Sequence, residues 1–165
     1  MPWEMRQIIL GIHIFLAIIW VGGVLFIGWG VYPALRKMAY AKQREFFLAL
    51  IQWSHNFLTA AGTGVIATGI VLGTLAGPIN QWADLWTTRY GNLWLAALVI
   101  ALLTLGWGVF IGYRQSVKVF SNISIWELAD SGETKPLSKA LGTTIAIESV
   151  EVGGFIALLV VMILL

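Results

Sequence analysis

The sequence predicts an all-α, polytopic integral membrane protein: a four-helix bundle with both termini outside the cytoplasm. The composition leads to this class. Of the 165 residues, 59% are hydrophobic and only 11% are charged, and the mean hydropathy is +0.85. A soluble domain of this size cannot hide that much apolar surface, so the lipid bilayer is the expected solvent. Because lipid offers the backbone no hydrogen-bond partners, the apolar runs are expected to form helices rather than open strands.

Four apolar stretches are long enough to cross a bilayer, which takes about 20 residues in a helix. They predict a single domain, residues 1–165, with helices over about 8–33, 46–76, 92–113 and 141–165. In the last loop, the string ISIWELADSGETKPLSKAL predicts a short interfacial helix, a turn at Ser131 and Gly132, and Pro136 at the start of the final helix. The many glycines within the stretches favour close packing of the four helices.

The basic residues predict the orientation. Loops 36–44 and 114–140 each hold four lysines or arginines, whereas the N-terminus and loop 77–91 each hold one. The positive-inside rule therefore places the two basic loops in the cytoplasm and both termini outside, in a multi-pass protein of the cell membrane. These cations account for the net charge of +2 without a nucleic-acid partner. The chain has no cysteine, which excludes disulfides, zinc–thiolate sites and c-type haem attachment.

Polar side chains inside the predicted spans are candidate functional groups, because burying them in lipid is costly. Their depth follows from counting about 1.5 Å per residue from the cation that ends each helix. His13 then lies about 34 Å from Arg36, and His55 lies about 16 Å from Arg44. A difference of about 18 Å in height argues against one haem held by both histidines.

An outer level of polar groups is expected around His13. Met162 lies about 34 Å above Lys139, at the height of His13, and the helical repeat puts it on one stripe with the glutamates of the last helix. Imidazole and thioether ligands suit haem iron or Cu(I), so His13 and Met162 are the predicted metal ligands. The other residues expected at the cofactor, or able to hold the second imidazole nitrogen, are Trp20, Thr68, Tyr90 and Asn92.

An inner level is expected around His55. Glu148 and Glu151 lie about 13 and 18 Å above Lys139, level with His55. Two glutamates one turn apart do not both stay ionised in lipid, so we expect one to be protonated or paired with His55. This set suits proton relay or binding of a harder cation. The structural alternative is that the histidines bond across helices and that Met162 fills the core.

Residues 13–26, HIFLAIIWVGGVLF, resemble the first helix of the copper-resistance protein D family: a histidine, a tryptophan seven residues later, then two glycines. TGIVLG at 68–73 and LWTTRYGNLW at 85–94 resemble the passage between the second and third helices of that family. The wider relatives include HemJ-type protoporphyrinogen oxidases, which hold b-type haem through a first-helix histidine. The resemblance implies a four-helix fold, a metal or haem, and His13 as the matching ligand.

One departure concerns the third helix, where both groups of relatives tend to carry a lysine and this chain reads LWLAALVIALL. The leading hypothesis is a membrane protein that handles a redox metal, copper or haem b, near the outer face. One alternative is a HemJ-like haem oxidoreductase that passes electrons to a quinone or a membrane redox partner. Another is a cofactor-free accessory or assembly subunit of a membrane complex. An oligomer is compatible with all three.

Overall fold

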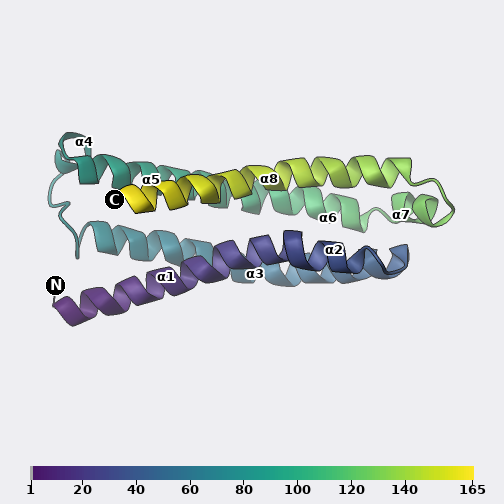
Figure 1. Cartoon of the computed structure of the whole chain (residues 1–165), viewed down its shortest axis with the longest axis horizontal. Coiled ribbons are helices and arrows are strands. Elements are labelled where there is room, and N and C mark those ends of the chain that lie inside the picture. The colour runs from purple at the N-terminus through teal and green to yellow at the C-terminus, as the bar shows by residue number, and fades with distance from the viewer. Residues whose placement is uncertain (1) are drawn as a thin grey trace.

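The structure, a computed structural model, describes residues 2–165. It is all-helical, with no strand in that range, and confirms the predicted fold class. Four long helical rods lie side by side (Figure 1). Both termini and the short helix α4 lie at one end of the bundle, and α2 and α7 lie at the other. All four rods are long and apolar enough to cross a membrane, as in a multi-pass membrane protein.

The helical elements follow one another along four rods and two connecting loops. Rods 1 and 3 each contain a single π-helical turn, named η1 and η2. Rod 1 runs from α1 to α2, rod 2 is α3, rod 3 runs from α5 to α6, and rod 4 is α8. The bounds are α1 (Trp3–Phe26), η1 (Ile27–Val31), α2 (Tyr32–Leu35), α3 (Tyr40–Gly73), α4 (Asp84–Thr87), α5 (Arg89–Trp107), η2 (Gly108–Gly112), α6 (Tyr113–Ser121), α7 (Ile123–Asp130) and α8 (Lys135–Leu164).

The rods extend past the predicted apolar stretches, mainly at the end that carries the basic residues. Rod 2 begins at Tyr40 rather than near residue 46, and rod 3 continues to Ser121 rather than ending near residue 113. A 33-residue rod is about 50 Å long at 1.5 Å per residue, whereas the hydrocarbon core is about 30 Å thick. Hydropathy drops where a helix leaves the hydrocarbon, but backbone hydrogen bonding continues into the polar layer.

The two π-helical turns have causes in the local sequence. In rod 1, Pro33 has no N–H to donate to the carbonyl of Trp29, and its ring pushes that carbonyl away, so the helix widens over Ile27–Val31. In rod 3, the turn begins and ends on glycine, at Gly108 and Gly112. Turns of this kind are frequent at functional sites.

The rods pack as two pairs. α1 packs on α3 and α5 packs on α8, while α3 joins the pairs through its contacts with α5 and α6. Small residues bring the partners close, as at Gly154, where an added Cβ would overlap the Thr104 side chain. α1 and α8 have little backbone contact with each other. The two pairs therefore leave a gap between α1 and α8 that side chains must fill.

The end of the bundle near α7 is closed by a basic-end cluster, in which Phe47 stacks on Phe120 with ring centroids 5.0 Å apart. The other buried members of this cluster are Trp126, Ala129 and Leu137. As predicted, the loop before α8 turns at Gly132, whose φ is +104°, and Pro136 stands in the first turn of α8. Large apolar side chains cover the outside of the rods, for example Trp29 at 72% exposed, which is the surface that lipid requires.

Candidate functional site

Two cavities occupy the gap between the helix pairs. The His13 cavity, of about 510 Å³, is lined by His13, Tyr90 and Met162 among others. The glutamate cavity, of about 310 Å³, is lined by Glu148 and Glu151 among others. Trp20 of α1 lines both and meets Phe155 of α8 edge to face, with ring centroids 5.1 Å apart. This aromatic pair is the wall between the cavities.

His13 is oriented by a hydrogen bond to α3. Its Nδ1 lies 2.8 Å from Oγ1 of Thr68, and the same hydroxyl donates its only hydrogen to the Gly64 carbonyl at 2.7 Å. With the hydroxyl hydrogen on the Gly64 carbonyl, the hydroxyl oxygen accepts from His13 Nδ1–H, and in that tautomer Nε2 keeps a free lone pair. A histidine that binds a metal through one nitrogen usually donates its other N–H in this way.

Gly69 lets the imidazole lie directly on the α3 backbone. A Cβ at this position would come within 3.3 Å of Cε1 of His13. The carbonyl of the same glycine accepts a hydrogen bond from the Trp94 indole at 3.1 Å, which ties α5 to α3 beside the cavity. Most of the cavity wall is aliphatic or aromatic, and Arg6 contributes a charged group.

Of the other residues expected near His13, some line its cavity and one does not. Trp20, Tyr90 and Met162 line the His13 cavity, although Met162 is also 45% exposed. Asn92 does not reach it: the side chain is exposed, and Nδ2 donates to the Trp86 carbonyl at 3.4 Å. Two residues along a helix correspond to about 200°, so Asn92 faces away from the side on which Tyr90 lies.

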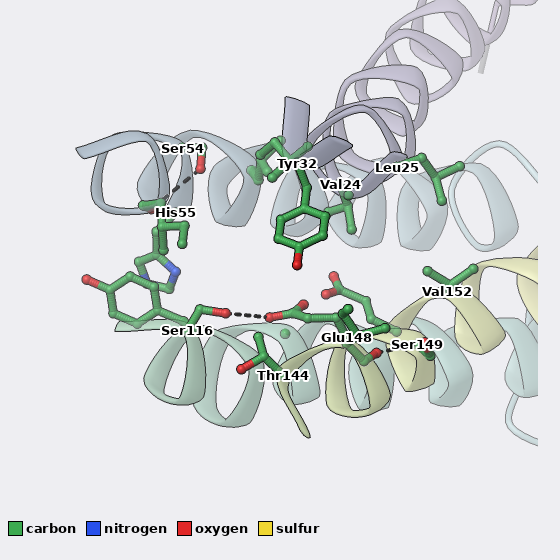
Figure 2. Close-up of a pocket in the computed structure, with 18 of the residues that line it drawn as sticks. Val24, Leu25, Tyr32, Ser54, His55, Ser116, Thr144, Glu148, Ser149 and Val152 are labelled. Atoms are coloured by element: carbon green, nitrogen blue, oxygen red, sulfur yellow. Dashed lines mark hydrogen bonds between the residues drawn. The ribbon is translucent and has the colours of Figure 1, made fainter. Parts of the chain in front are cut away.

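The glutamate cavity brings together the three residues expected at the inner level, His55, Glu148 and Glu151. Ser116 donates a hydrogen bond to Oε1 of Glu148 at 2.9 Å (Figure 2). Glu151 is only 5% exposed and has the Trp20 indole beside it. The described residues that line this cavity include no lysine or arginine. Two carboxyl groups thus face one cavity whose described lining holds His55 but no lysine or arginine.

Both carboxyl groups lie against the π-helical turn η2. A Cβ at Gly108 would come within 2.7 Å of Glu151 Oε1, and a Cβ at Gly112 would come within 3.1 Å of Glu148 Oε1. Only glycine leaves room for the two side chains here. The second π-helical turn, η1, borders the same cavity through residues 27–29.

His55 stacks on Tyr113, with ring centroids 3.7 Å apart and an interplanar angle of 21°. Of the two expected states of the glutamates, protonated or paired with His55, the described hydrogen bonds include no pairing with His55, and Glu148 is bonded to Ser116. Figure 2 shows His55 at one side of the cavity and Glu148 at the other, with the Tyr32 hydroxyl pointing into the space between the helices. The two histidines line different cavities, as the depth argument against a shared haem requires.

Sequence reasoning missed Ser116, Tyr113 and Tyr32 as members of this cavity. A signal for the first was present, since Gly108, Gly112 and Ser116 recur every four residues and so form a small-residue stripe on one helix face. That stripe is the surface on which the glutamates of α8 pack. The two tyrosines carry no comparable signal in the sequence.

Within residues 2–165, no three histidine, aspartate or glutamate side chains converge as a metal-binding group. Each cavity instead offers a different chemistry: one free imidazole nitrogen in apolar surroundings, and two carboxyl groups among aromatic rings. No family model, curated protein or solved structure matches the chain.

Proposed function

We propose that this protein is a b-type haem protein of the membrane, in which His13 would hold the haem iron and electron transfer would be the role. The observation that carries the proposal is the 2.8 Å contact between His13 Nδ1 and the Thr68 hydroxyl, which holds the imidazole at a cavity of about 510 Å³ through one nitrogen and leaves Nε2 for a ligand. Ligand cavities commonly measure about 300–1,000 Å³. The resemblance of residues 13–26 to the first helix of the copper-resistance protein D family, and more widely to HemJ-type proteins, supports a bound metal or haem.

The number of donor groups favours haem over a copper ion. A porphyrin supplies four ligands to its iron, so one imidazole is enough to attach it. A copper ion held by protein alone needs several soft or nitrogen ligands. His13 and Met162 are the nitrogen and thioether donors on this cavity, and the rest of its wall is mainly apolar.

The lining residues fit haem b. Gly69 leaves room beside the imidazole, and Arg6, on the same face of α1 as His13, offers a charged partner for the carboxylates of the haem. Met162 would supply a second protein ligand to the iron, and Trp20 and Tyr90 would pack on the group. When bound, haem supplies one-electron redox chemistry, with a potential raised by methionine ligation. A quinone or a membrane redox protein is the proposed electron partner.

The absorption spectrum of the purified protein tests this function. A Soret band is expected, and His13→Ala should remove it completely. His55→Ala is the matched control, because His55 lines the other cavity and should leave the haem content unchanged. Met162→Leu preserves side-chain volume and should shift the spectrum if the thioether binds the iron.

Three other outcomes would overturn the proposal. A colourless protein with stoichiometric copper would indicate a copper carrier. A protein that binds neither haem nor copper would indicate an accessory subunit. Equal haem in wild type and His13→Ala would remove the proposed ligand. A HemJ-like oxidoreductase would use the same haem site. Oxidation of a porphyrinogen by the haem-loaded protein would show this enzymatic activity in addition to electron transfer.

We also propose that both termini lie outside and the basic-end cluster lies at the cytoplasmic side, on the asymmetry of eight cations against two. Since the chain has no cysteine, single cysteines can report each side. A cysteine at exposed Gln81 should react with an impermeant thiol reagent in intact cells, and one at exposed Ser131 should not. The reverse labelling pattern would invert the orientation. Gln43 is unsuitable as a reporter because it is buried, at 7% exposed.

A further inference from the structure

The glutamate cavity has a composition that the proposed haem function does not use. Glu148 and Glu151 line it together with a set of aromatic side chains. These aromatic residues are Trp20, Trp29, Tyr32, Phe47, Tyr113 and Phe120. Aromatic faces attract cations, most strongly where water is excluded. Carboxyl groups attract them as well, and His55 is the basic side chain in the described lining of this cavity.

Glu151 is the more deeply buried of the two acidic groups. Its side chain is 5% exposed, and the Trp20 indole lies beside it. A carboxylate can accept about four hydrogen bonds. Glu148, by contrast, already accepts one from Ser116. Most of the acceptor capacity of Glu151 is thus directed into the cavity.

The size of the cavity distinguishes between kinds of cation. Its volume of about 310 Å³ is roughly ten times the ~30 Å³ that one water molecule occupies in the liquid. A single dehydrated inorganic ion would fill a small part of this space and would leave the aromatic walls uncontacted. A small organic cation would bring its charge to the carboxyl groups and its carbon atoms to the rings.

The cavity is bounded along the bundle axis and reaches the lipid-facing side. Trp20 closes it toward the His13 cavity, and Phe47 and Phe120 of the basic-end cluster line its other end. Trp29 lines the cavity and is 72% exposed, so the rim extends to the surface that contacts lipid. Backbone contact between α1 and α8 is sparse, so side chains rather than backbone separate the cavity from the lipid on this side.

We propose that the glutamate cavity is a binding site for a small monovalent organic cation, such as an amphipathic quaternary or protonated amine, that enters from the lipid between α1 and α8. Glu151 supplies the principal negative charge, Glu148 supports it, and the aromatic side chains surround the cation. The site is separate from the proposed haem site, so either proposal can fail without the other.

Titration calorimetry of the purified full-length protein with benzyltrimethylammonium tests the site. Saturable binding is expected at constant ionic strength. Glu151→Gln should weaken it about tenfold or more, because the cation loses its principal counter-charge. Glu148→Gln should weaken it less, since Glu148 is already bonded to Ser116. Glu127→Gln makes the same change of charge on an exposed residue of α7, away from the cavity, and should have no effect.

A second measurement needs no variant. Neopentylbenzene has the shape of the probe with carbon in place of nitrogen, and it should bind wild-type protein far more weakly. Equal binding of the two would show a purely apolar pocket and overturn the proposal. Displacement of the probe by sodium at matching concentrations would indicate an inorganic ion site and would also overturn it, as would unchanged affinity in folded Glu151→Gln.

Discussion

The two cavities share a gap and a wall formed by Trp20, Leu25, Trp29 and Val152, yet they place opposite chemistry in the membrane. The His13 cavity presents one neutral nitrogen whose partner, Thr68, determines which nitrogen is free. The glutamate cavity presents two acidic groups against the bare backbone of a π-helical turn. A four-helix bundle can thus enclose two cavities of different chemistry on one axis, with a bulky residue, Trp20, between them.

The largest expected effect comes from removing that separation. Trp20 is 2% exposed and lines both cavities. Trp20→Ala should join the cavities and lower the free energy of unfolding by about 2 kcal/mol or more, through lost van der Waals contacts with Phe155 and other neighbours. Haem content and cation affinity should both fall. Denaturant unfolding in detergent micelles measures the stability, and the assays above measure the two sites.

Trp29→Ala is the matched control for that change. Trp29 also lines both cavities, but it is 72% exposed, so its removal should cost less than about 1 kcal/mol. If the two tryptophan variants are equally stable, Trp20 is not the structural wall between the sites.

A second change should affect the His13 cavity alone. Thr68→Val keeps the shape of the side chain but removes the acceptor for His13 Nδ1. Loss of such a partner typically weakens metal binding by about 10–100-fold. Haem retention during dilution measures the loss, and cation binding should stay at the wild-type level. Thr63→Val, which removes only an exposed hydroxyl bonded to the Thr59 carbonyl, should leave both unchanged.

The third change should affect the glutamate cavity alone and more mildly. An added Cβ at Gly108 would press on the Glu151 carboxyl group, 2.7 Å away, whereas one at Gly106 would meet nothing within 4 Å. Gly108→Ala should reduce the affinity for benzyltrimethylammonium severalfold, while Gly106→Ala should not. Haem content should be the same in both. A fall in haem content with Gly108→Ala would mean that the two sites are coupled.

The smallest effect is expected in the loop between α3 and α5, next to the His13 cavity. The backbone N–H groups of Asn80 and Gln81 donate to Asp84, at 2.8 and 3.0 Å, and hold the pKa of its carboxyl group below the ordinary value. Because this pKa is lowered in the folded protein, the ionised carboxylate stabilises the fold at pH values above the ordinary pKa of aspartate. This contribution is lost as the pH falls through the lowered pKa.

Asp84→Asn should therefore lower the melting temperature slightly at neutral pH, and the difference from wild type should vanish in acid. Thermal melts at a series of pH values measure it. A difference independent of pH would mean that the carboxylate charge has no part in capping this loop. Cation binding in the glutamate cavity should not change.

The sequence alone determined the class of the protein and which faces of its helices point inward. Four apolar stretches in 165 residues require lipid as the solvent, and lipid in turn requires helices. Because polar side chains are costly in lipid, His13, Glu148 and Glu151 face the interior of the bundle. Met162 lies on the same face of its helix as the two glutamates, as the helical repeat predicts. These inferences need only the period of a helix and the cost of a polar group in hydrocarbon.

The tertiary structure alone decided which groups meet. The pairing of Ser116 with Glu148 depends on the register between rod 3 and rod 4, which no single helix contains. The free nitrogen of His13 depends on the hydroxyl of Thr68, 55 residues away. Asn92 is predicted at the height of His13 but does not reach the cavity. Height along a helix can be counted from the sequence, but the direction of a side chain depends on how the whole bundle packs.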